Sequence, residues 1–444
     1  MHKLMQIVAL IALAVPAGAI EVTTTPGQLS SLIEDTGVTQ LTVTGEMDAR
    51  DFLYIGSELT SLTTLDLSGV TIVAYSDSRH PLVGGVSDYA AGTLPHSMLM
   101  GMKLEQLTLP ATLVSIGNHA LAGCDRLTSI ELPATVTTIG DYAFSGTSLQ
   151  QVTIPVTVQS VGRGAFAHCF ALQHATVSAP VIGDCAFLGD ESLQTLALGA
   201  EVRRIGSEAF HGTGIQSLDA SHALSLDSLG SWALAGTPLT TVSLPSAMTV
   251  MGEGAFFGTQ LTAASLPRSL RQVPDYAFAG GSQIEADTLL HEGVSRIGDY
   301  AFYNWSNSRY FYIPGTVRHL GTRAMAGMTG LERIDIAASQ VPTLGEAVWD
   351  GVYQPAVQLN VLSSAATVLY AAAEQWQEFN IMNPLLLGDV NDDGVVDVLD
   401  INLTINHILG KTSEHFNLAA ADVDGNGTID TMDVNRIINI VLGK

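Results

Sequence analysis

Residues 388–400 of the chain, GDVNDDGVVDVLD, crowd several aspartates into about a dozen positions. Like charges that close repel by about 4 kcal/mol per pair near a protein surface, so this stretch is a poor structural choice unless it binds a cation. Counted from Asp389, side-chain oxygens fall at positions 1, 3, 5, 9 and 12. A loop with this spacing surrounds one Ca²⁺ with six or seven oxygens. The expected ligands are Asp389, Asn391, Asp393, the carbonyl of Val395, Asp397 and Asp400, with Gly394 at the sharp turn.

The same spacing returns near the end of the chain. Residues 397–411 align with residues 430–444, and both segments end in Gly-Lys. After each loop, apolar residues recur at helical spacing, which predicts two helices that pack together and end at Gly410 and Gly443. The residues expected to pack are Ile401, Ile405, Ile408, Leu409, Val434, Ile437, Ile438, Val441 and Leu442. The sequence therefore predicts a small all-α domain that holds two Ca²⁺ ions. The expected ligands of the second ion are Asp422, Asp424, Asn426, the carbonyl of Thr428, Asp430 and Asp433, with Gly427 at the turn.

Residues 385–444 resemble a type I dockerin. Each loop is followed by a helix and ends in Asp where a full EF-hand has Glu, and Pro384 and Gly388 disfavour a helix before the first loop. Dockerins attach secreted proteins to cohesin domains on scaffolds, so the resemblance implies a cohesin-type partner. It also places the partner contact at loop positions 10 and 11, which are often hydroxylic in well-known dockerins. Here they are Val398 and Leu399 in one copy and Thr431 and Met432 in the other, and these side chains could instead dock on the protein's own repeat array.

A repeat of 21 to 25 residues fills the middle of the chain, as in LTSIELPATVTTIGDYAFSGT (127–147) and LQQVTIPVTVQSVGRGAFAHC (149–169). A period of this size indicates a solenoid. The opening L-x-x-Φ-x-Φ predicts a short parallel strand with one buried face, where Φ is apolar. The A-F-x-G segment predicts a helical or 3₁₀ turn, and the glycine before it, such as Gly140 or Gly206, requires positive φ or a close backbone approach.

Equivalent apolar side chains of successive repeats are expected to stack into ladders inside the solenoid, because no single unit buries its apolar residues alone. Cys124 and Cys169 occupy one repeat position and are interpreted as small buried residues, whereas a contact of Cys169 with Cys185 stays open. The main ladder comprises Phe144, Phe166, Phe187, Phe210, Phe256, Phe278 and Phe302, continued by Leu121, Leu234, Met325 and Val348.

These repeats resemble the BspA-like leucine-rich repeats of bacterial secreted and surface proteins. Residues 26–55 and 62–69 look like the leading cap of that family, and residues 368–381 look like its closing segment. The resemblance covers about residues 21–383. It implies a leucine-rich repeat solenoid of short parallel β-strands with helical or 3₁₀ turns.

The outward side chains of the short strands are expected to form a concave polar face rich in hydroxyls. Tyr310 and Tyr312 are the aromatic residues on this polar face, and a sugar ring could stack there. Exposed Thr and Ser are also good solvated strand residues, and this simpler interpretation is favoured. The other residues of the polar face are Gln106, Thr108, Ser129, Glu131, Gln151, Thr153, His174, Thr176, Thr195, Ser217, Asp219, Thr241 and Ser243.

Composition and the first residues indicate a secreted protein. Residues 1–19 have Lys3, a short apolar run and a small-residue end, which is typical of a cleaved signal peptide, and no later stretch could span a bilayer. The formal net charge of −25 disfavours nucleic acid and anionic membranes as partners. Three cysteines are too few for a disulfide scaffold.

The sequence therefore divides into a leader (1–19), an N-terminal cap with the first repeats (20–103), the repeat array with its closing cap (104–383) and the dockerin-like domain (385–444). The favoured function is a non-catalytic extracellular or cell-surface binding protein. Its solenoid recognises a protein or glycan, and its calcium-dependent tail binds a cohesin-bearing scaffold in polysaccharide degradation or adhesion. The alternatives are a glycoside hydrolase-type component of such a complex, or a tail that is only a calcium-stabilised cap. Glu131, Asp219 and Asp335 are the carboxylates of the polar face, but they are expected to lie far apart.

Overall fold

The computed structural model describes residues 18–262, 264–281, 289–338, 340–361, 364–381, 386–393, 395–413 and 416–443. Most of the predicted leader lies outside these residues, as do Pro384, Gly394 and Lys444. The chain divides into two compact units, residues 1–152 and 153–444, and the strand β10 (Gln151–Ile154) crosses the division.

The first unit begins with a cap of strands and helices. Strands β1, β2, β3 and β7 form a parallel sheet in that order. Asp48 caps helix α2, and its side chain accepts a hydrogen bond from the Arg50 amide. In turn, the buried Asp51 side chain accepts a hydrogen bond from the Asp48 amide. The elements of the cap are β1 (Ala19–Thr24), α1 (Leu29–Leu32), β2 (Gln40–Met47), α2 (Ala49–Glu58) and β3 (Thr64–Ile72).

Short strands and one hairpin make up the rest of the first unit. Strands β4 and β5 pair antiparallel, a hairpin that the repeat pattern did not predict. Strands β6, β8 and β9 pair in parallel. The bounds are β4 (Tyr75–Ser76), η1 (Val83–Gly85), β5 (Asp88–Tyr89), β6 (Thr93–Leu94), β7 (Gln106–Thr108), β8 (Ser115–Ile116) and β9 (Thr138–Ile139).

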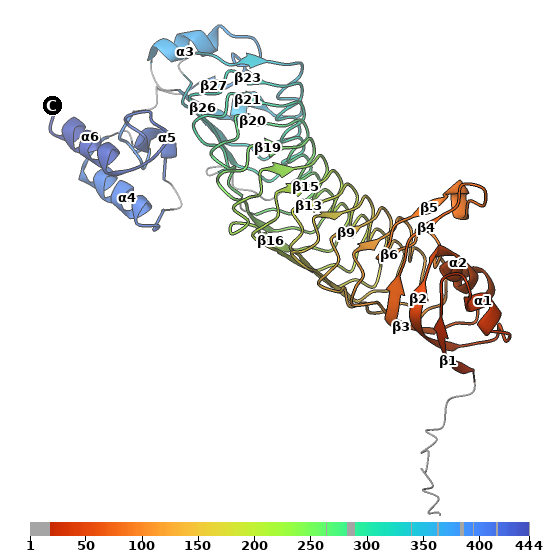
Figure 1. Ribbon diagram of the computed structural model, residues 1–444. Coiled ribbons are helices and arrows are strands. Elements are labelled where there is room, and N and C mark those ends of the chain that lie inside the picture. The colour runs from red at the N-terminus through yellow and green to blue at the C-terminus, as the bar shows by residue number, and fades with distance from the viewer. Residues whose placement is uncertain are drawn as a thin grey trace, which may run out of the picture. The chain divides into compact units, whose positions relative to one another are not determined.

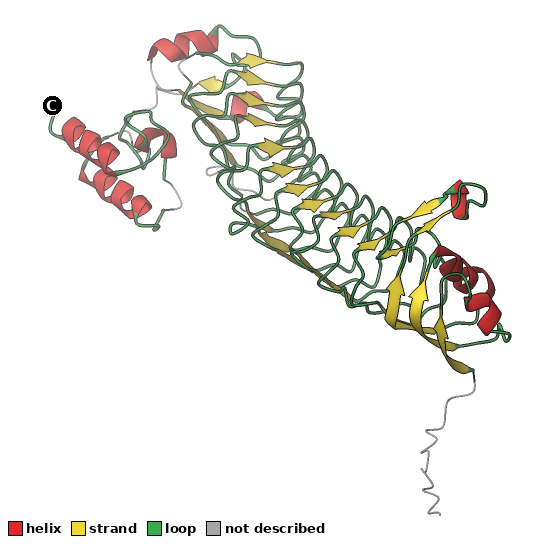
Figure 2. Ribbon diagram, viewed as in Figure 1, coloured by secondary structure: helices red, strands yellow, loops and turns green. Residues whose placement is uncertain are grey.

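The second unit carries two rows of short parallel strands, which appear as yellow arrows between green turns in Figure 2. The first row, predicted from the sequence, contains β12 (His174–Val177), β14 (Thr195–Leu198), β16 (Ser217–Asp219), β18 (Thr241–Ser243), β22 (Tyr310–Ile313), β24 (Arg333–Ile336), β26 (Gln358–Val361) and β27 (Asn380–Ile381). The strands of the second row come later in each repeat. They are β11 (Ser160–Val161), β13 (Val181–Ile182), β15 (Arg204–Ile205), β17 (Ser228–Leu229), β19 (Val250–Met251), β20 (Gln272–Val273), β21 (Arg296–Ile297), β23 (His319–Leu320) and β25 (Thr343–Leu344).

The predicted aromatic ladder is confirmed. Every member of the ladder is buried, and the rings of successive repeats stack in parallel planes. The ring centroids of Phe187 lie 5.2 Å from those of both Phe166 and Phe210, and those of Phe256 and Phe278 are 5.4 Å apart. The ladder therefore belongs to the core of the solenoid and is not a ligand site.

The repeated glycine is required for close backbone approach and not for positive φ. A Cβ atom on Gly206 would lie 2.6 Å from the Asp184 amide nitrogen of the preceding coil, and Gly206 itself is not in the left-handed region. Positive φ falls two residues later, at Glu208 (φ 55°) and, one coil on, at Trp232 (φ 58°). Of the two explanations that the sequence left open, close approach is the correct one here.

The A-F-x-G segment forms successive turns and not a continuous helix. The Phe210 amide donates across to the Ala233 carbonyl of the next coil at 2.9 Å, while the Thr213 amide donates back to the Phe210 carbonyl at 3.3 Å. Alternate amides therefore bond between coils and within the coil. This alternation ties the coils together on the side away from the first strand row.

The closing segment covers the last coil with aromatic rings. It contains η2 (Gln354–Ala356), α3 (Ser364–Ala371) and strand β27. Trp376 is buried and packs edge-on against Trp349, with ring centroids 5.3 Å apart. Residues 368–381, for which the sequence predicts a cap, thus pack on the last coil through Trp376.

The C-terminal residues 386–443, here called the terminal module, form two helices of eleven residues and one short helix. Helices α4 (Val398–Ile408) and α6 (Thr431–Val441) pack side by side, and α5 (Leu418–Ala421) precedes the second loop (Figure 1). Gly410 (φ 74°) and Gly443 (φ 64°) end the helices, as predicted. The core contains Val390, Phe416, Ala421 and Ile437, with Val396, Ile401, Leu403, Leu418, Val423, Ile429 and Val441 around it.

Part of the predicted helix packing is wrong. Ile405, Ile408, Leu409 and Leu442 are exposed, because the core lies between α4, α6 and the loops and not along one continuous stripe. Among the described residues, no helix has the length and apolar character needed to cross a bilayer. Cys124 and Cys169 are buried, as predicted, and Cys185 is half-buried.

Candidate metal centre

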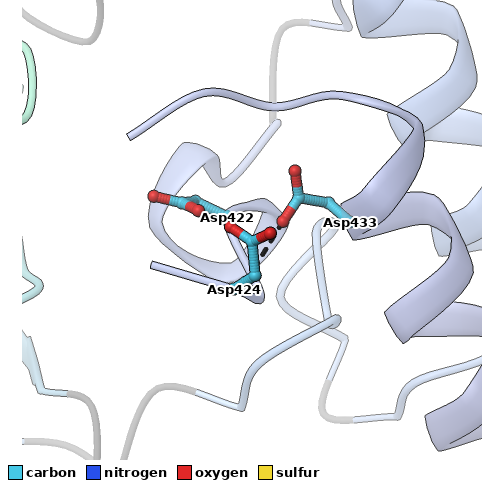
Figure 3. Close-up of side chains that lie close together, drawn as sticks. All are labelled: Asp422, Asp424 and Asp433. Atoms are coloured by element: carbon cyan, nitrogen blue, oxygen red, sulfur yellow. Dashed lines mark hydrogen bonds between the residues drawn. The ribbon is translucent and has the colours of Figure 1, made fainter. Parts of the chain in front are cut away.

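The second acidic loop brings three carboxylates together. Single oxygens of Asp422, Asp424 and Asp433 lie within 4.8 Å of one another. Figure 3 shows the three side chains lying close together, and Asp433 belongs to the first turn of α6. Sequence spacing placed these residues at positions 1, 3 and 12, and the fold makes them neighbours.

Backbone amides hold the ligands of this loop in place. The carboxylate of Asp422 accepts from the amides of Asn426 at 3.1 Å and Gly427 at 2.9 Å. The Asn426 side chain accepts from the Thr428 amide at 2.8 Å. Asp430 caps α6 and accepts from the Met432 amide at 2.6 Å. The loop is therefore already wrapped around its acidic centre.

The first loop has related backbone contacts, but among the described residues only the second loop gathers three carboxylates in this way. The carboxylate of Asp400, which is fully buried, accepts from the amides of Val390 and Asp397, both at 2.8 Å. Asp389 is also buried and accepts from the Asp393 amide at 3.1 Å. Gly394 lies outside the described residues, so its turn is not described. Position 12 thus has the same role in both loops, since Asp400 and Asp433 each bond the N-cap amide of the following helix.

The donor set fits a hard divalent cation. Burial raises the pKa of Asp422, a hydrogen bond from Gly427 opposes this rise, and the charge of Asp433 adds to it. Arg436 Nε lies 4.0 Å from Asp424 Oδ2, at the edge of the cluster. Carboxylate, amide and carbonyl oxygens at these positions are the ligands that Ca²⁺ prefers. A cation would relieve the repulsion between the carboxylates of Asp422 and Asp433.

Loop positions 10 and 11 face solvent. Val398 is 61% exposed, Leu399 51% and Met432 55%, and Thr431 is also exposed. In this structure these side chains therefore do not contact the repeat array. Apolar side chains exposed at equivalent places in both copies are available to a partner.

The terminal module does contact the array, but through other residues. Ala419 and Ala420 of α5 pack on Tyr312 of β22, and Asp392 forms an ion pair with Arg333 of β24. Tyr312 is consequently buried, so the predicted sugar-stacking role of Tyr310 and Tyr312 does not fit this structure. No sequence pattern predicts this contact, because it depends on where the module folds back.

The remaining polar face agrees with the sequence analysis. Apart from Asp335, the hydroxyl, amide and acidic residues predicted to point outward from the first strand row are exposed. Asp335 is the exception among the acidic side chains: it is fully buried, and Arg333 donates to it at 2.8 and 2.6 Å. A carboxylate held in this way is not available for acid–base chemistry on a substrate.

Two family models match the chain. The BspA type leucine rich repeat region matches in six copies, over residues 92–213, 176–285 and 286–354. The chain belongs to the BspA-type leucine-rich repeat proteins. The dockerin type I domain matches residues 387–442, so the terminal module is a dockerin. Neither match identifies a catalytic domain. A comparison with curated proteins found no match.

Solved structures of bacterial leucine-rich repeat proteins are similar to this BspA-type chain. A leucine-rich repeat protein from Bacteroides ovatus is 19% identical with a TM-score of 0.47, over 78% of this chain and 84% of that one. A leucine rich cell surface protein from Faecalibacterium prausnitzii is 18% identical with a TM-score of 0.32, over 68% and 80%. The pneumococcal vaccine antigen PcpA is 16% identical with a TM-score of 0.38, over 71% and 84%.

Proposed function

We propose that this protein is a secreted, non-catalytic binding protein whose dockerin binds a cohesin-bearing scaffold in a calcium-dependent manner. Its leucine-rich repeats recognise a protein or glycan in polysaccharide degradation or adhesion. The proposed division of the chain is a leader (1–19), the cap and first repeats (20–103), the array with its closing cap (104–383) and the dockerin (385–444). The dockerin match and the leader-like first residues support an extracellular or cell-surface location.

The observation that carries this proposal is the convergence of Asp422, Asp424 and Asp433 in the second loop. The first loop shares with it the hydrogen bond from the N-cap amide to the carboxylate at position 12. We assign two Ca²⁺ ions to the two sets of loop residues given above. Each ion would join a loop to the start of its following helix, because position 12 belongs to both. The helices carry the exposed positions 10 and 11, so calcium would order the partner surface.

A glycoside hydrolase function has less support. Both matched families are typically non-catalytic, and Asp335 is already paired with Arg333. Retaining and inverting glycosidases need two carboxyl groups on either side of the scissile bond. The polar face is therefore assigned to recognition.

Capture of the full-length protein on an immobilised cohesin-type domain from the source organism tests the attachment. We expect binding in calcium, loss of binding in chelator, and binding weakened about tenfold or more by the double variant Leu399→Glu, Met432→Glu, because charge would replace apolar contact at the centre of an interface. The matched control Leu224→Glu alters an exposed leucine of the array and should bind normally. Capture that survives chelation would contradict the proposal.

A further inference from the structure

The terminal module covers one end of the polar face. Both partners of this contact belong to the unit 153–444. Ala419 and Ala420, two small residues of α5, lie flat against the ring of Tyr312, with Tyr310 and Ala337 at the edge. Tyr312 is left only 7% exposed. An aromatic side chain that points outward from its strand is thus buried by a distant part of the same chain.

Arg333, which lies beside this ring, is held in an orientation that suits the binding of an anion. Two nitrogens of Arg333 donate to Asp335, which also accepts from the Tyr310 hydroxyl at 2.8 Å and from Asn360 Nδ2 at 2.7 Å. The guanidinium lies over the Tyr310 ring, 5.4 Å from its centroid. These contacts fix the orientation of Arg333, and its remaining nitrogen Nη1 meets Asp392. An ion pair with a pre-positioned arginine loses less conformational entropy than one between two free side chains.

The loop position, backbone conformation and contacts of Asp392 indicate that it binds the array and not a metal ion. It occupies position 4 of the first loop, between two predicted ligands, and its φ is 57°. The second loop has Gly425 at this position, with φ 72°. A side chain in this region costs about 1 to 2 kcal/mol, which glycine avoids. Contacts outside the loop offset this cost, because Asp392 accepts from Asn417 Nδ2 at 2.6 Å and pairs with Arg333.

The second loop also lies against the array. Asp422, its first expected ligand, lines a cavity of about 330 Å³ together with Tyr312, Glu292 and Thr316 of the array. Gly427 faces the Glu292 side chain so closely that a Cβ atom would collide with it. Both calcium loops therefore contribute to the contact, one through Asp392 and the other through residues 422–427.

We propose that the calcium-loaded terminal module docks on the Tyr312–Arg333 patch of its own array and covers this end of the polar face. Positions 10 and 11 of both loops stay exposed in the docked state, so the array and an external partner use different surfaces of the module. A ligand of the polar face then binds along the earlier strands, such as β16 and β18. The calcium dependence of docking rests on the proposed function, whereas the docking contact itself does not.

Hydroxyl-radical footprinting of the full-length protein, read by mass spectrometry, tests the docking through oxidation of Tyr312. In calcium, Tyr312 should be as protected as the buried Tyr370, while the exposed Tyr353 reacts in every sample. The variant Asp392→Gly copies the residue of the second loop and keeps the backbone conformation. It should raise Tyr312 oxidation several-fold while two Ca²⁺ ions still bind. The control Asp350→Gly removes a different surface ion pair, with Arg323, and should leave Tyr312 protected.

The outcomes separate docking from calcium binding. Reactive Tyr312 in the calcium-loaded wild type, or protected Tyr312 in Asp392→Gly, would overturn the docking. Tyr312 that stays protected after chelation would overturn its calcium dependence. If calorimetry detects no calcium binding, the proposed function fails, yet the comparison of wild type with Asp392→Gly still decides the docking.

Discussion

Asp433 Oδ1 accepts a hydrogen bond from the backbone amide of Asp424 at 3.2 Å, which links position 12 of the second loop to position 3. The other oxygen of Asp433 accepts from the Asp430 amide at 2.9 Å. One side chain therefore closes the loop and starts helix α6. The short aspartate side chain suits this double role, because its carboxylate stays close to the backbone of the N-cap residue.

Asp433→Asn should reduce the calcium affinity of the second site about tenfold or more, since it removes a formal charge and one oxygen from the donor set. The amide oxygen still accepts one backbone hydrogen bond, so the fold is retained. Titration calorimetry of the full-length protein should show two tight sites in the wild type and one in the variant. The control Asp219→Asn alters an exposed carboxylate of the polar face and should keep both sites. Two unchanged sites in Asp433→Asn would show that position 12 is not a ligand.

The double variant Asp389→Ala, Asp422→Ala should abolish the calcium-induced gain of helicity. Helices of eleven residues, such as α4 and α6, are marginal on their own in water and depend on their packing and loops. Circular dichroism at 222 nm, recorded with and without chelator, measures the change. The thermal transition of the array should be retained, because its ladders do not involve the loops. Equal helicity of the wild type with and without chelator would contradict calcium-dependent folding.

The acidic loops and the ladder could be predicted from the sequence because both depend on short-range spacing. Positions 1, 3, 5 and 12 define a loop whatever surrounds it, and Phe187 repeats at the solenoid period. The burial of Tyr312 could not be read in this way. It depends on Ala419, more than a hundred residues away, and an outward tyrosine on a strand looks the same whether it is covered or exposed.

The repeat pattern also did not predict which residues adopt positive φ. Gly206 stands out in the sequence, but the left-handed residue is Glu208, which no composition rule singles out. The second strand row was missed because each of its strands spans only two residues, too few for an alternation to be visible. Asp392 has no place in the ligand spacing of the first loop, and only the position of Arg333 gives it a role.

Gly206→Ala should destabilise the array more than Gly212→Ala in the same coil. A Cβ atom on Gly206 would lie 2.6 Å from backbone atoms of the preceding coil. That backbone cannot shift without separating the stacked side chains of the ladders, so we expect the substitution to cost about 1 to 3 kcal/mol or more. Gly212 has φ 68° but open space, with only the Gly189 Cα at 4.0 Å, so alanine there costs about 1 kcal/mol of local strain. Urea unfolding compares the two variants, and the reverse order would contradict the close-approach explanation.

Asp190 is a buried acid at a repeat position where other coils have threonine. The Oδ1 atom accepts from the Cys169 amide at 2.8 Å, and Oδ2 has no hydrogen-bond partner in the described part of the chain. Burial raises the pKa of Asp190 to about 9. In contrast, the hydroxyl groups of Thr213 and Thr259 each donate to a backbone carbonyl within their own coil, at 3.0 and 2.9 Å.

Asp190→Thr should therefore stabilise the array at neutral pH, by about 1 to 3 kcal/mol, the usual cost of a buried polar atom without a partner. The gain should depend on pH. An unfolded aspartate releases its proton near pH 4, whereas folded Asp190 keeps its proton up to about pH 9, so the wild-type free energy of unfolding falls as pH rises between these values. Urea unfolding at pH 7.5 and pH 4 should show a larger advantage of the variant at pH 7.5. Asp219→Thr, at an exposed position, should give no such difference. An advantage of Asp190→Thr that is equal at both pH values would mean that folded Asp190 is ionised at neutral pH.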